Sequence, residues 1–412
     1  MMDTGRVGGG VDGRPEPDTE PGRVGQGGGG GGGTPLESRY ETRMLKEALK
    51  LYTLSKHEGP MAEFLMERCR EMGFSDVHVD EVGNVIARKG SGPPSVMLCG
   101  HMDVVPGRVP VRIEGDCMYG RGASDAKAPL MAMLFAAAAI PDDGSGGTVT
   151  FVGAVDEEGN ATGIKNLVKK RMGIDYAIFG EPSSTKQVTI AYKGRLAINL
   201  RVRSKNSSHA SAPWLSKNAI TESMTFAARL KADLEGGQEG VSKGRMLTVT
   251  VTMIKGGTGH NITPSECETT FDIRIPVGGS CKETEQRVAT LLRDAGKQLG
   301  VDPFYSILDE TEPFEAPHNS PLVRAFTLGV LKIEKERPVL VRKTGTGDMN
   351  VLGYQWGIPV VTYGPGDPHE AHTQDEKVSI SEYLRGIEIF KETLRRLKIL
   401  HDKRAERAGG QQ

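Results

Sequence analysis

The sequence predicts an α/β fold in which a mostly parallel-sheet domain carries an inserted ferredoxin-like α+β domain. Over much of the 412-residue chain, short apolar runs that end in glycine or a polar residue alternate with helical stretches. This alternation is typical of a buried, mostly parallel sheet covered by helices. From about residue 193 to 309 the order changes to strand, helix, strand, strand, helix, strand, which is the ferredoxin-like order. Because the first pattern resumes after Pro313, we expect the first domain to be discontinuous.

The chain divides into five expected segments. They are a Gly/Pro-rich tail at 1–35, the first part of the main domain at 36–192, the insertion at 193–309, the second part of the main domain at 310–400, and a flexible C-terminus at 401–412. We expect the tail to be disordered, because the run Gly27–Gly33 has a large backbone entropy to lose and no side chain to bury. A translation start further downstream is the alternative to a functional tail.

Apolar spacing predicts the elements of the main domain. A first helix is expected around Leu45 and a second from Pro60 to Met72. Buried strands are expected at SVMLCG, GTVTFVGAV and YAIFG, with helices at 128–140 and 163–171 between them. After Pro313 we expect a helix, the strand GIPVVTYG and a closing helix over 381–400.

The insertion is read in the same way. Its expected strands are LAINLRVRS, MLTVTVTMI, ECETTFDIRI and PFYSIL, and its expected helices lie within 217–234 and 282–300.

Composition and charge exclude several classes of protein. With 52 Lys and Arg against 53 Asp and Glu, the formal net charge is -1, so no overall field attracts nucleic acid or acidic lipid. The most apolar stretch, 130–140, is about half the length that spans a bilayer, so we expect no membrane segment. The five cysteines are odd in number and include no CxxC pair, which argues against a disulfide framework and indicates a cytoplasmic protein.

Chemically active side chains follow the expected strands, at the edge where α/β folds place their sites. The candidates are His101 and Asp103 after the first strand, Asp125 in a Gly-rich loop, Asp156, Glu157 and Glu158 after the second strand, Glu181 after the third, and His369 and His372 near the C-terminus. Histidine nitrogens with carboxylate oxygens and no sulfur are the ligand set of a catalytic Zn, Mn or Co site. The alternative is that each is a solvated surface residue and that Asp156 to Glu158 form a helix-capping cluster.

Five motifs, GHMDVVP, GRGASDAKAP, DEEGN, GEPS and HTQDE, occur in this order along the chain. With the inserted domain, they make the sequence from about Leu45 to Leu397 resemble the zinc-dependent deacylases and exopeptidases. That family includes succinyl-diaminopimelate desuccinylase, acetylornithine deacetylase, aminoacylase and glutamate carboxypeptidase. Within it, EGDCMYGRGASDAKAP and VRKTGTGDMN are most similar to the hydrolases that release lysine or ornithine from a small acidic amino-group carrier protein.

The resemblance implies two divalent metal ions per subunit, with zinc first and cobalt or manganese as alternatives. One ion would be held by His101, Asp125 and Glu181, and the other by Asp125, Glu158 and His372, with Asp125 bridging. A bridging carboxylate sets two ions about 3.5 to 4 Å apart, a spacing that suits joint activation of a water and a carbonyl. His372 is chosen over His369 because the family has a glutamate four residues after its histidine, and Glu376 fits.

Two carboxylates are expected to serve the reaction without being ligands. Asp103 would accept the ring N–H of His101 and fix its tautomer, and capping of the next turn is its alternative role. Glu157 and Glu158 are neighbours in an extended segment, so their side chains point to opposite sides. We therefore expect Glu158 to be a ligand and Glu157 to be the general base, which passes a proton to the leaving amine. Asp156 would be the spare carboxylate.

Further positions match residues on the substrate side of the family's site. His209 in SSHASAP matches a histidine that reaches a neighbouring subunit's site and stabilises the oxyanion, and a plain surface role is its alternative. The positions that match substrate-holding residues are Asn261, Arg274, Gly345 and Thr346. Arg274 could equally pair with a charge across neighbouring strands.

The resemblance therefore predicts a homodimeric, cytoplasmic two-metal amidohydrolase that releases lysine, ornithine or both from a carrier protein in lysine or arginine biosynthesis. The alternatives are a small-molecule deacylase, acting on acetylornithine or succinyl-diaminopimelate, and a dipeptidase. A non-catalytic scaffold is disfavoured because Glu157 and every implied ligand are present. The chain departs from the family pattern at Ala128, where glycine is usual, and at Gly347, where serine is common.

Overall fold

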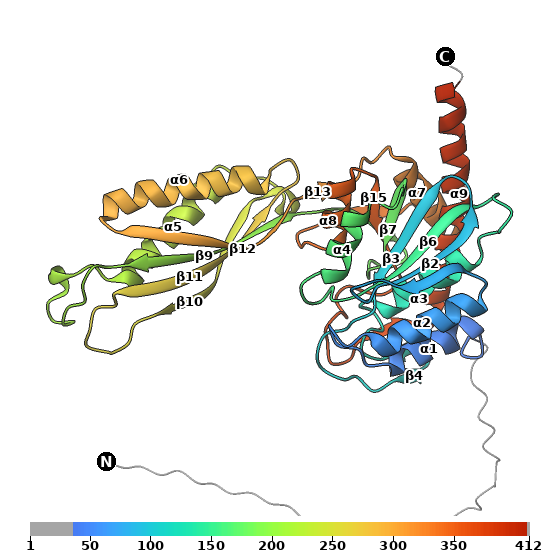
Figure 1. Cartoon of the computed structure of the whole chain (residues 1–412), viewed down its shortest axis with the longest axis horizontal. Helices are drawn as coiled ribbons and strands as arrows, with labels where there is room; N and C mark the ends of the chain where they lie inside the picture. Colours follow the sequence, from blue (N-terminus) through green and yellow to red (C-terminus); the bar gives the residue numbers. More distant parts are fainter. Residues whose placement is uncertain (1–35, 410–412) are drawn as a thin grey trace, which may run out of the picture.

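The computed structural model describes residues 36–409, so the tail expected at 1–35 and the segment 410–412 lie outside the described part. Two lobes are seen in Figure 1, a larger one built around a wide sheet and a smaller one that projects from its side. Elements before and after the smaller lobe belong to the same wide sheet, so the smaller lobe is inserted into the larger one.

The wide sheet combines a parallel centre with antiparallel edges. Its strands in spatial order are β1 (Ser75–Val79), β2 (Val85–Ser91), β6 (Gly147–Ala154), β3 (Ser95–His101), β7 (Tyr176–Phe179), β15 (Val360–Thr362), β8 (Gln187–Tyr192) and β13 (Phe314–Glu315), with β14 (Val339–Lys343) also paired to β8. The central strands β6, β3, β7 and β15 run parallel, whereas β1, β2 and β13 pair antiparallel with their neighbours. The expected α/β fold is confirmed, and the carboxyl ends of β3, β6 and β7 meet at one edge of the sheet.

Helices cover both faces of this sheet. They are α1 (Tyr40–Lys50), α2 (Gly59–Glu71), α3 (Lys127–Ala138), α4 (Thr162–Lys170), α7 (Pro321–Glu334), α8 (Asp348–Trp356) and α9 (Ile380–Gly409). Alternate residues of β3 point to opposite faces. Val96 and Leu98 lie in the core that α1, α2, α3, α7 and α9 share, and Met97 and Cys99 lie in the core under α4 and α8. A strand buried on both faces is apolar without interruption, which is why its pattern is visible in the sequence.

The long elements are predicted well and several short ones are missed. The hairpin of β1 and β2, the strands β8 and β14, and helix α8 have no counterpart among the expected elements. A small separate sheet of β4 (Arg112–Glu114), β5 (Cys117–Tyr119) and β16 (Lys377–Ser379) is also missed. Helix α9 continues to Gly409, so residues 401–409 of the segment expected as a flexible C-terminus are helical.

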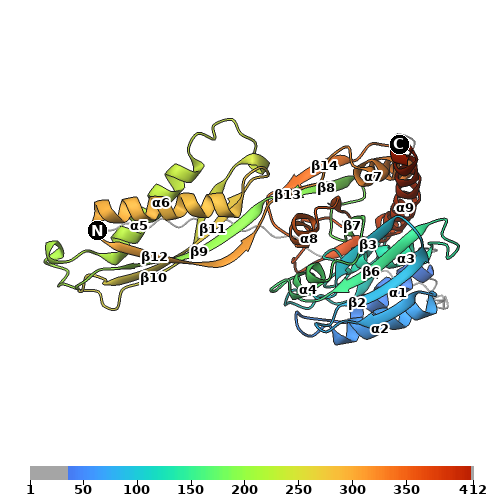
Figure 2. The same ribbon diagram turned by 45° about the horizontal axis from the view of Figure 1, so that its top comes forward.

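The inserted lobe has the expected element order. It contains β9 (Gly194–Arg203), α5 (Ala219–Glu235), β10 (Thr248–Gly256), β11 (Glu266–Ile275), α6 (Cys281–Leu299) and β12 (Asp302–Thr311). Its antiparallel sheet has the order β10, β11, β9, β12, and its two helices lie on one face of that sheet (Figure 2). Alternate residues of β9, from Leu196 to Val202, form a core of their own with these helices. This core shares no residue with the two cores of the larger lobe.

The two crossings between the lobes lie side by side. Tyr192, the last residue of β8, pairs with Phe314, the first residue of β13. At the entry to the insertion, a Cβ atom on Gly194 would lie 2.7 Å from Pro313 and from the carbonyl oxygen of Thr311. Only glycine allows this close approach of the incoming and outgoing strands.

Within residues 36–409, none of the helices combines the length and the apolar character that crossing a bilayer requires.

Candidate metal centre

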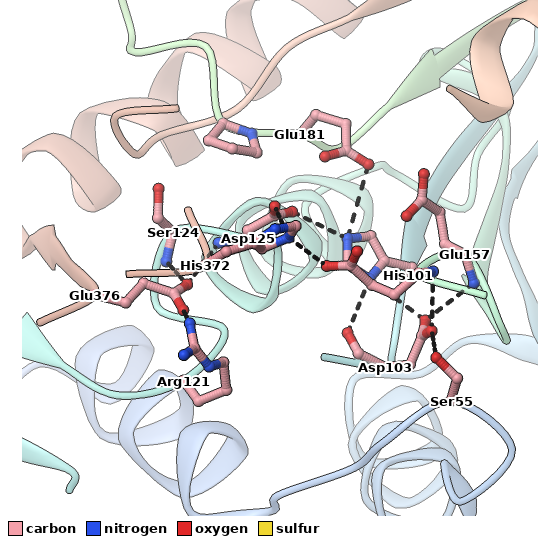
Figure 3. Close-up of polar contacts among 12 residues, drawn as sticks. Ser55, His101, Asp103, Arg121, Ser124, Asp125, Glu157, Glu181, His372 and Glu376 are labelled. Carbon is pink, nitrogen blue, oxygen red and sulfur yellow. Dashed lines mark hydrogen bonds and ion pairs between the residues drawn. The ribbon is translucent and has the colours of Figure 1, made fainter. Parts of the chain in front are cut away.

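The expected ligands converge on the carboxyl edge of the wide sheet (Figure 3). They come from five places along the chain. His101 ends β3, Glu158 follows β6, Glu181 follows β7, Asp125 lies in the loop before α3, and His372 lies in the segment between β15 and β16. Parallel strands that end at the same edge bring these distant segments together.

Asp125 lies between the two histidines. Its Oδ1 is 3.3 Å from His101 Nε2, and its Oδ2 is 3.1 Å from His372 Nε2. Glu181 Oε1 lies 3.8 Å from His101 Nε2, and Glu158 Oε1 lies 2.9 Å from His372 Nε2. The ligand atoms of His101, Asp125 and Glu181 lie within 4.8 Å of one another, and so do those of Asp125, Glu158 and His372. Both expected groups are therefore brought together, and they share Asp125.

Glu157 lies close to the same groups. A third set of potential ligand atoms, which also lie within 4.8 Å of one another, consists of the carboxylate oxygens of Glu157 and Glu158 and a ring nitrogen of His101. The side chain of Glu157 takes part in none of the hydrogen bonds or ion pairs found within residues 36–409 and lines the cavity described below. Glu158, in contrast, contacts His372.

Burial and crowding shift the pKa values of these groups. Burial raises the pKa of Glu157 to about 8, with the charges of Asp348 and Glu158 acting in the same direction and His101 opposing them. Burial also raises the pKa of Glu181 well above its usual range. Burial works against ionisation of Asp125 too, but the two histidines lower its pKa well below the usual range. The hydrogen bond that His372 donates to the carboxylate of Asp125 raises the pKa of His372 to about 9.

This arrangement fits divalent cations. The donor set consists of imidazole nitrogens and carboxylate oxygens, which suits Zn, Mn or Co in a catalytic site. It also concentrates carboxylates in a poorly solvated place, where their mutual repulsion is relieved by bound cations.

Asp103 holds the backbone beside the ligands. The nearer acceptor for His101 Nδ1 is the backbone carbonyl of Asp103, at 2.9 Å, whereas the carboxylate Oδ1 lies 3.4 Å away. The carboxylate also accepts hydrogen bonds from Ser55 Oγ at 2.7 Å and from the backbone N–H groups of Glu157 and Glu158 at 3.2 and 3.1 Å. Asp103 is thus placed beside the His101 ring, as expected, and its side chain additionally holds the Glu157–Glu158 segment, which the sequence did not indicate.

Asp156 has the alternative role considered for it, which is to cap the start of a helix. Its backbone carbonyl accepts the N–H of Ala161 at 2.7 Å, and its carboxylate accepts the hydroxyl of Thr162 at the start of α4. Asp156 is thereby turned away from the ligands, while the two glutamates that follow it face them.

A buried ion pair behind the ligands was missed. Glu376 Oε2 lies 2.7 Å from Arg121 Nη1, and Glu376 Oε1 accepts the backbone N–H groups of Ser124 and Asp125 at 2.9 Å each. Both side chains are almost fully buried. In the sequence, Glu376 served only to distinguish His372 from His369, although the charged residues inside GRGASD and HTQDE are a signal that could have pointed to the pair.

A cavity of about 270 Å³ opens beside the expected ligands Asp125, Glu158, Glu181 and His372. Thr346 lies in its wall, as expected, together with Lys343. Gly345 instead lines a neighbouring cavity of about 610 Å³ with Arg274.

Arg274 lies beside the substrate-side segment and is also paired. Its Nη1 donates to Thr346 Oγ1 at 3.3 Å, and its Nε lies 2.6 Å from the carboxylate of Asp272 on the same strand. The structure therefore places Arg274 next to Thr346 and also gives it an ion-pair partner.

His209 and Asn261 lie together at the other end of the inserted lobe. The backbone carbonyl of Asn261 accepts the N–H of Ala210 at 2.8 Å. Both residues are in loops beyond Arg203 and Glu266, which pair with each other at the end of the sheet remote from Gly194. In Figure 1 these loops are at the tip that points away from the larger lobe. Within one chain, these two residues are not brought to the metal centre.

The two family-pattern departures leave the ligands in place. Ala128 is fully buried in the first turn of α3. At Gly347 an added Cβ would meet only the ring of Tyr192, at 4.0 Å, so the backbone there does not depend on glycine.

The sequence of this chain is similar to those of known proteins. Residues 97–396 match the model of Peptidase family M20/M25/M40. A [LysW]-lysine/[LysW]-ornithine hydrolase of Sulfurisphaera tokodaii is 33% identical over 347 residues, which cover 84% of this chain and 92% of that one. A [LysW]-lysine hydrolase of Deinococcus radiodurans is 30% identical over 356 residues, 86% of this chain and 96% of that one.

Solved structures with the same fold were also found. Aminopeptidase PepT of Bacillus cereus superposes with a TM-score of 0.74 at 21% identity, over 87% of this chain and 98% of that chain. An M20 family metallo-carboxypeptidase of Sulfolobus solfataricus superposes with a TM-score of 0.72 at 20% identity, over 88% of this chain and all of that one. These likenesses concern the fold alone.

Proposed function

The chain belongs to Peptidase family M20/M25/M40, and from this premise we propose that it is a two-metal amidohydrolase that releases lysine, ornithine or both from an amino-group carrier protein. The observation that carries the proposal is Asp125, which presents one carboxylate oxygen to each of the two histidines. A carboxylate placed in this way is suited to bridge two cations.

The two ions would share this chain's ligands as follows. His101, Asp125 and Glu181 would hold one ion, and Asp125, Glu158 and His372 the other. Zinc is our first choice and cobalt or manganese the alternatives, because all three accept nitrogen and oxygen donors. When bound, such ions supply the Lewis acidity that polarises an amide carbonyl and acidifies water.

Glu157 is the residue placed to move the proton. It lines the cavity, its carboxylate has no partner among the described residues, and Asp103 holds its backbone through the hydrogen bond at 3.2 Å. A carboxylate in this position can take a proton from the attacking water and deliver it to the nitrogen of the leaving amine.

The proposal includes a homodimer in which the inserted lobe completes the partner's site. The loops that carry His209 and Asn261 lie at the tip of that lobe, away from the metal centre of the same chain. The edge strand β10 exposes apolar side chains, with Met253 67% and Ile254 52% exposed. An apolar edge strand favours pairing with a second copy of the chain. His209 would then act as an oxyanion donor in the neighbouring subunit.

The substrate assignment rests on the relatives. Their names specify lysine and ornithine attached to LysW, and this chain aligns with them over most of its length. We place the reaction in lysine or arginine biosynthesis and the protein in the cytoplasm, in keeping with five free cysteines.

One experiment separates the substrate classes. The zinc-loaded protein is incubated in parallel with carrier-linked lysine, carrier-linked ornithine and N-acetylornithine, and the released amino acid is quantified. We expect kcat/KM for a carrier-linked substrate to exceed that for N-acetylornithine by about 100-fold or more. A preference for N-acetylornithine would replace the carrier protein with a small acylated amino acid, and release from neither class would point to a dipeptidase.

A further inference from the structure

A second cavity adjoins the one at the metal centre. It has a volume of about 360 Å³ and is lined by residues of both lobes, including Lys165 and Arg195. Glu157 and the segment from Thr346 to Asp348 line both cavities. This segment is therefore a wall that the two spaces share, and a substrate bound at Glu157 has room on both sides of it.

Asp348 is a buried carboxylate in that wall. It is the first residue of α8, it is only 8% exposed, and its side chain makes no hydrogen bond or ion pair with any residue in the range 36–409. The residue lines both cavities, so its carboxylate is placed beside the space where a substrate would bind. A carboxylate in such a place is costly unless a cation joins it.

The charges around Asp348 leave this position without a committed cation. Glu157 and Asp103 are negative neighbours, and His101 belongs to the ligand set. Lys165 on α4, which is not a candidate metal ligand, attracts the Asp348 carboxylate electrostatically, but its own side chain is exposed to solvent.

The other cation of the second cavity is already engaged. Arg195 pairs with Asp272 at 2.7 Å and with Asp309 at 2.9 Å. A ligand that brings its own positive charge would therefore find Asp348 free.

We propose that Asp348 binds the side-chain ammonium group of the amino acid that the enzyme releases, and that it thereby selects basic amino acids. The inference rests on the proposed function in one respect, because it takes the leaving amino acid to be lysine or ornithine. The scissile amide nitrogen would lie by Glu157, and the side chain would extend along the wall to Asp348. The bound substrate then supplies the cation that the protein does not.

A different role for Asp348 makes a different prediction. Its negative charge also acts on Glu157. If that were its only role, removing the charge would change turnover of every substrate by the same factor. A binding role changes only those substrates that carry the ammonium group.

The test therefore compares two leaving amino acids on one acyl group. Lysine and norleucine differ in the terminal ammonium group, and each is supplied both carrier-linked and N-acetylated. We expect the wild-type protein to prefer lysine in kcat/KM, and Asp348→Asn to lose about 10- to 100-fold on lysine with less than about threefold change on norleucine. Asp348→Glu, which keeps the charge, should retain part of the preference.

Asp367→Asn is the matched control. Asp367 carries an exposed carboxylate at 2.8 Å from His369, near the metal-centre cavity but outside its lining. This variant should keep the wild-type preference for lysine. Because each preference is a ratio measured on one protein sample, partial unfolding of a variant cancels.

Binding gives a second readout that does not depend on turnover. Calorimetry with free lysine and free norleucine should show tighter binding of lysine to the zinc-loaded wild type and no such difference for Asp348→Asn. Equal binding of the two amino acids by the wild type, or an equal loss on both substrates in Asp348→Asn, would overturn the inference. Turnover of the N-acetylated series alone would reject the carrier protein and leave the Asp348 comparison intact.

Discussion

Glu376 Oε1 accepts the backbone N–H of Asp125 at 2.9 Å, across 251 positions of the sequence. The other oxygen of Glu376 pairs with buried Arg121. This ion pair fixes the carboxylate, which in turn fixes the loop that carries Asp125. That loop presents Asp125 to His101 and His372. The position of Asp125, the candidate bridging ligand, therefore depends on a residue outside both candidate ligand groups.

The first prediction concerns this buried pair. Glu376→Gln leaves the Arg121 charge buried without a counter-ion, so the free energy of unfolding should fall by about 3 kcal/mol. Metal affinity should fall by about 10- to 100-fold, because the loop that carries Asp125 loses its support. Denaturant unfolding and metal titration measure the two effects.

Glu370→Gln is the control for that substitution. Glu370 pairs with Lys377 at 2.7 Å in a partly exposed position, and such pairs contribute about 0 to 1 kcal/mol. Equal effects of the two substitutions would show that the buried pair does not support the loop.

The second prediction is metal dependence. Chelation should abolish hydrolysis, and zinc, cobalt or manganese should restore it, because amide hydrolysis at neutral pH needs the Lewis acidity of the bound ions. Activity is followed together with elemental analysis of the same samples. Full activity in a protein shown to be free of metal would reject the two-metal assignment.

The third prediction separates the adjacent glutamates. Glu157→Gln should keep both metals and lose several orders of magnitude in kcat, because the proton acceptor is gone. Glu158→Gln should also weaken one metal, since Glu158 lies 2.9 Å from His372 within a ligand group. Metal content and kcat are measured for both variants, and loss of metal from Glu157→Gln alone would reverse the two roles.

The fourth prediction concerns the tip of the inserted lobe. His209→Ala should keep the fold, the dimer and both metals but lose about two to three orders of magnitude in kcat, the usual cost of one oxyanion donor. His369→Ala is the matched control, because His369 is an exposed histidine whose side chain makes hydrogen bonds and ion pairs only with Asp367 among the described residues. It should keep nearly full activity.

Mixing variants tests whether His209 acts across the dimer. A heterodimer of His209→Ala and Glu157→Gln contains one site with both an intact Glu157 and an intact partner His209. Random exchange should therefore restore up to about a quarter of wild-type activity. If exchange is verified and activity stays at the level of the separate variants, His209 does not act in the neighbouring subunit.

Local patterns and the family resemblance together were sufficient to name the candidate ligands that the structure brings together, but not the residues that support them. His101 and Glu181 each follow an apolar strand, and a strand buried on both faces is visible from composition alone. The contact between Arg121 and Glu376 joins segments far apart in the sequence, and no local period marks such a pair. The role of Asp103 depends on which of its oxygens faces which N–H, a detail fixed only by three-dimensional packing.

The same limit explains the missed elements. The parallel pairing of β8 with β14 joins residues 187–192 with residues 339–343, a contact that no local pattern marks, although the apolar run QVTIAY of β8 is itself a strand signal. The sequence predicts that the closing helix ends at residue 400, because the apolar spacing stops there. In the structure the polar turns that follow remain helical to Gly409.

The pairing of Tyr192 with Phe314 has an evolutionary consequence. The insertion leaves and re-enters the host at one point, as the loop of a β-hairpin does, so a short turn there would reconnect β8 to β13 without moving either strand. Such a module can be added, removed or replaced while the strands that carry the candidate metal ligands, β3, β6 and β7, stay in place. Substrate range and subunit contacts could then diverge by replacement of one module rather than by gradual change of the whole chain.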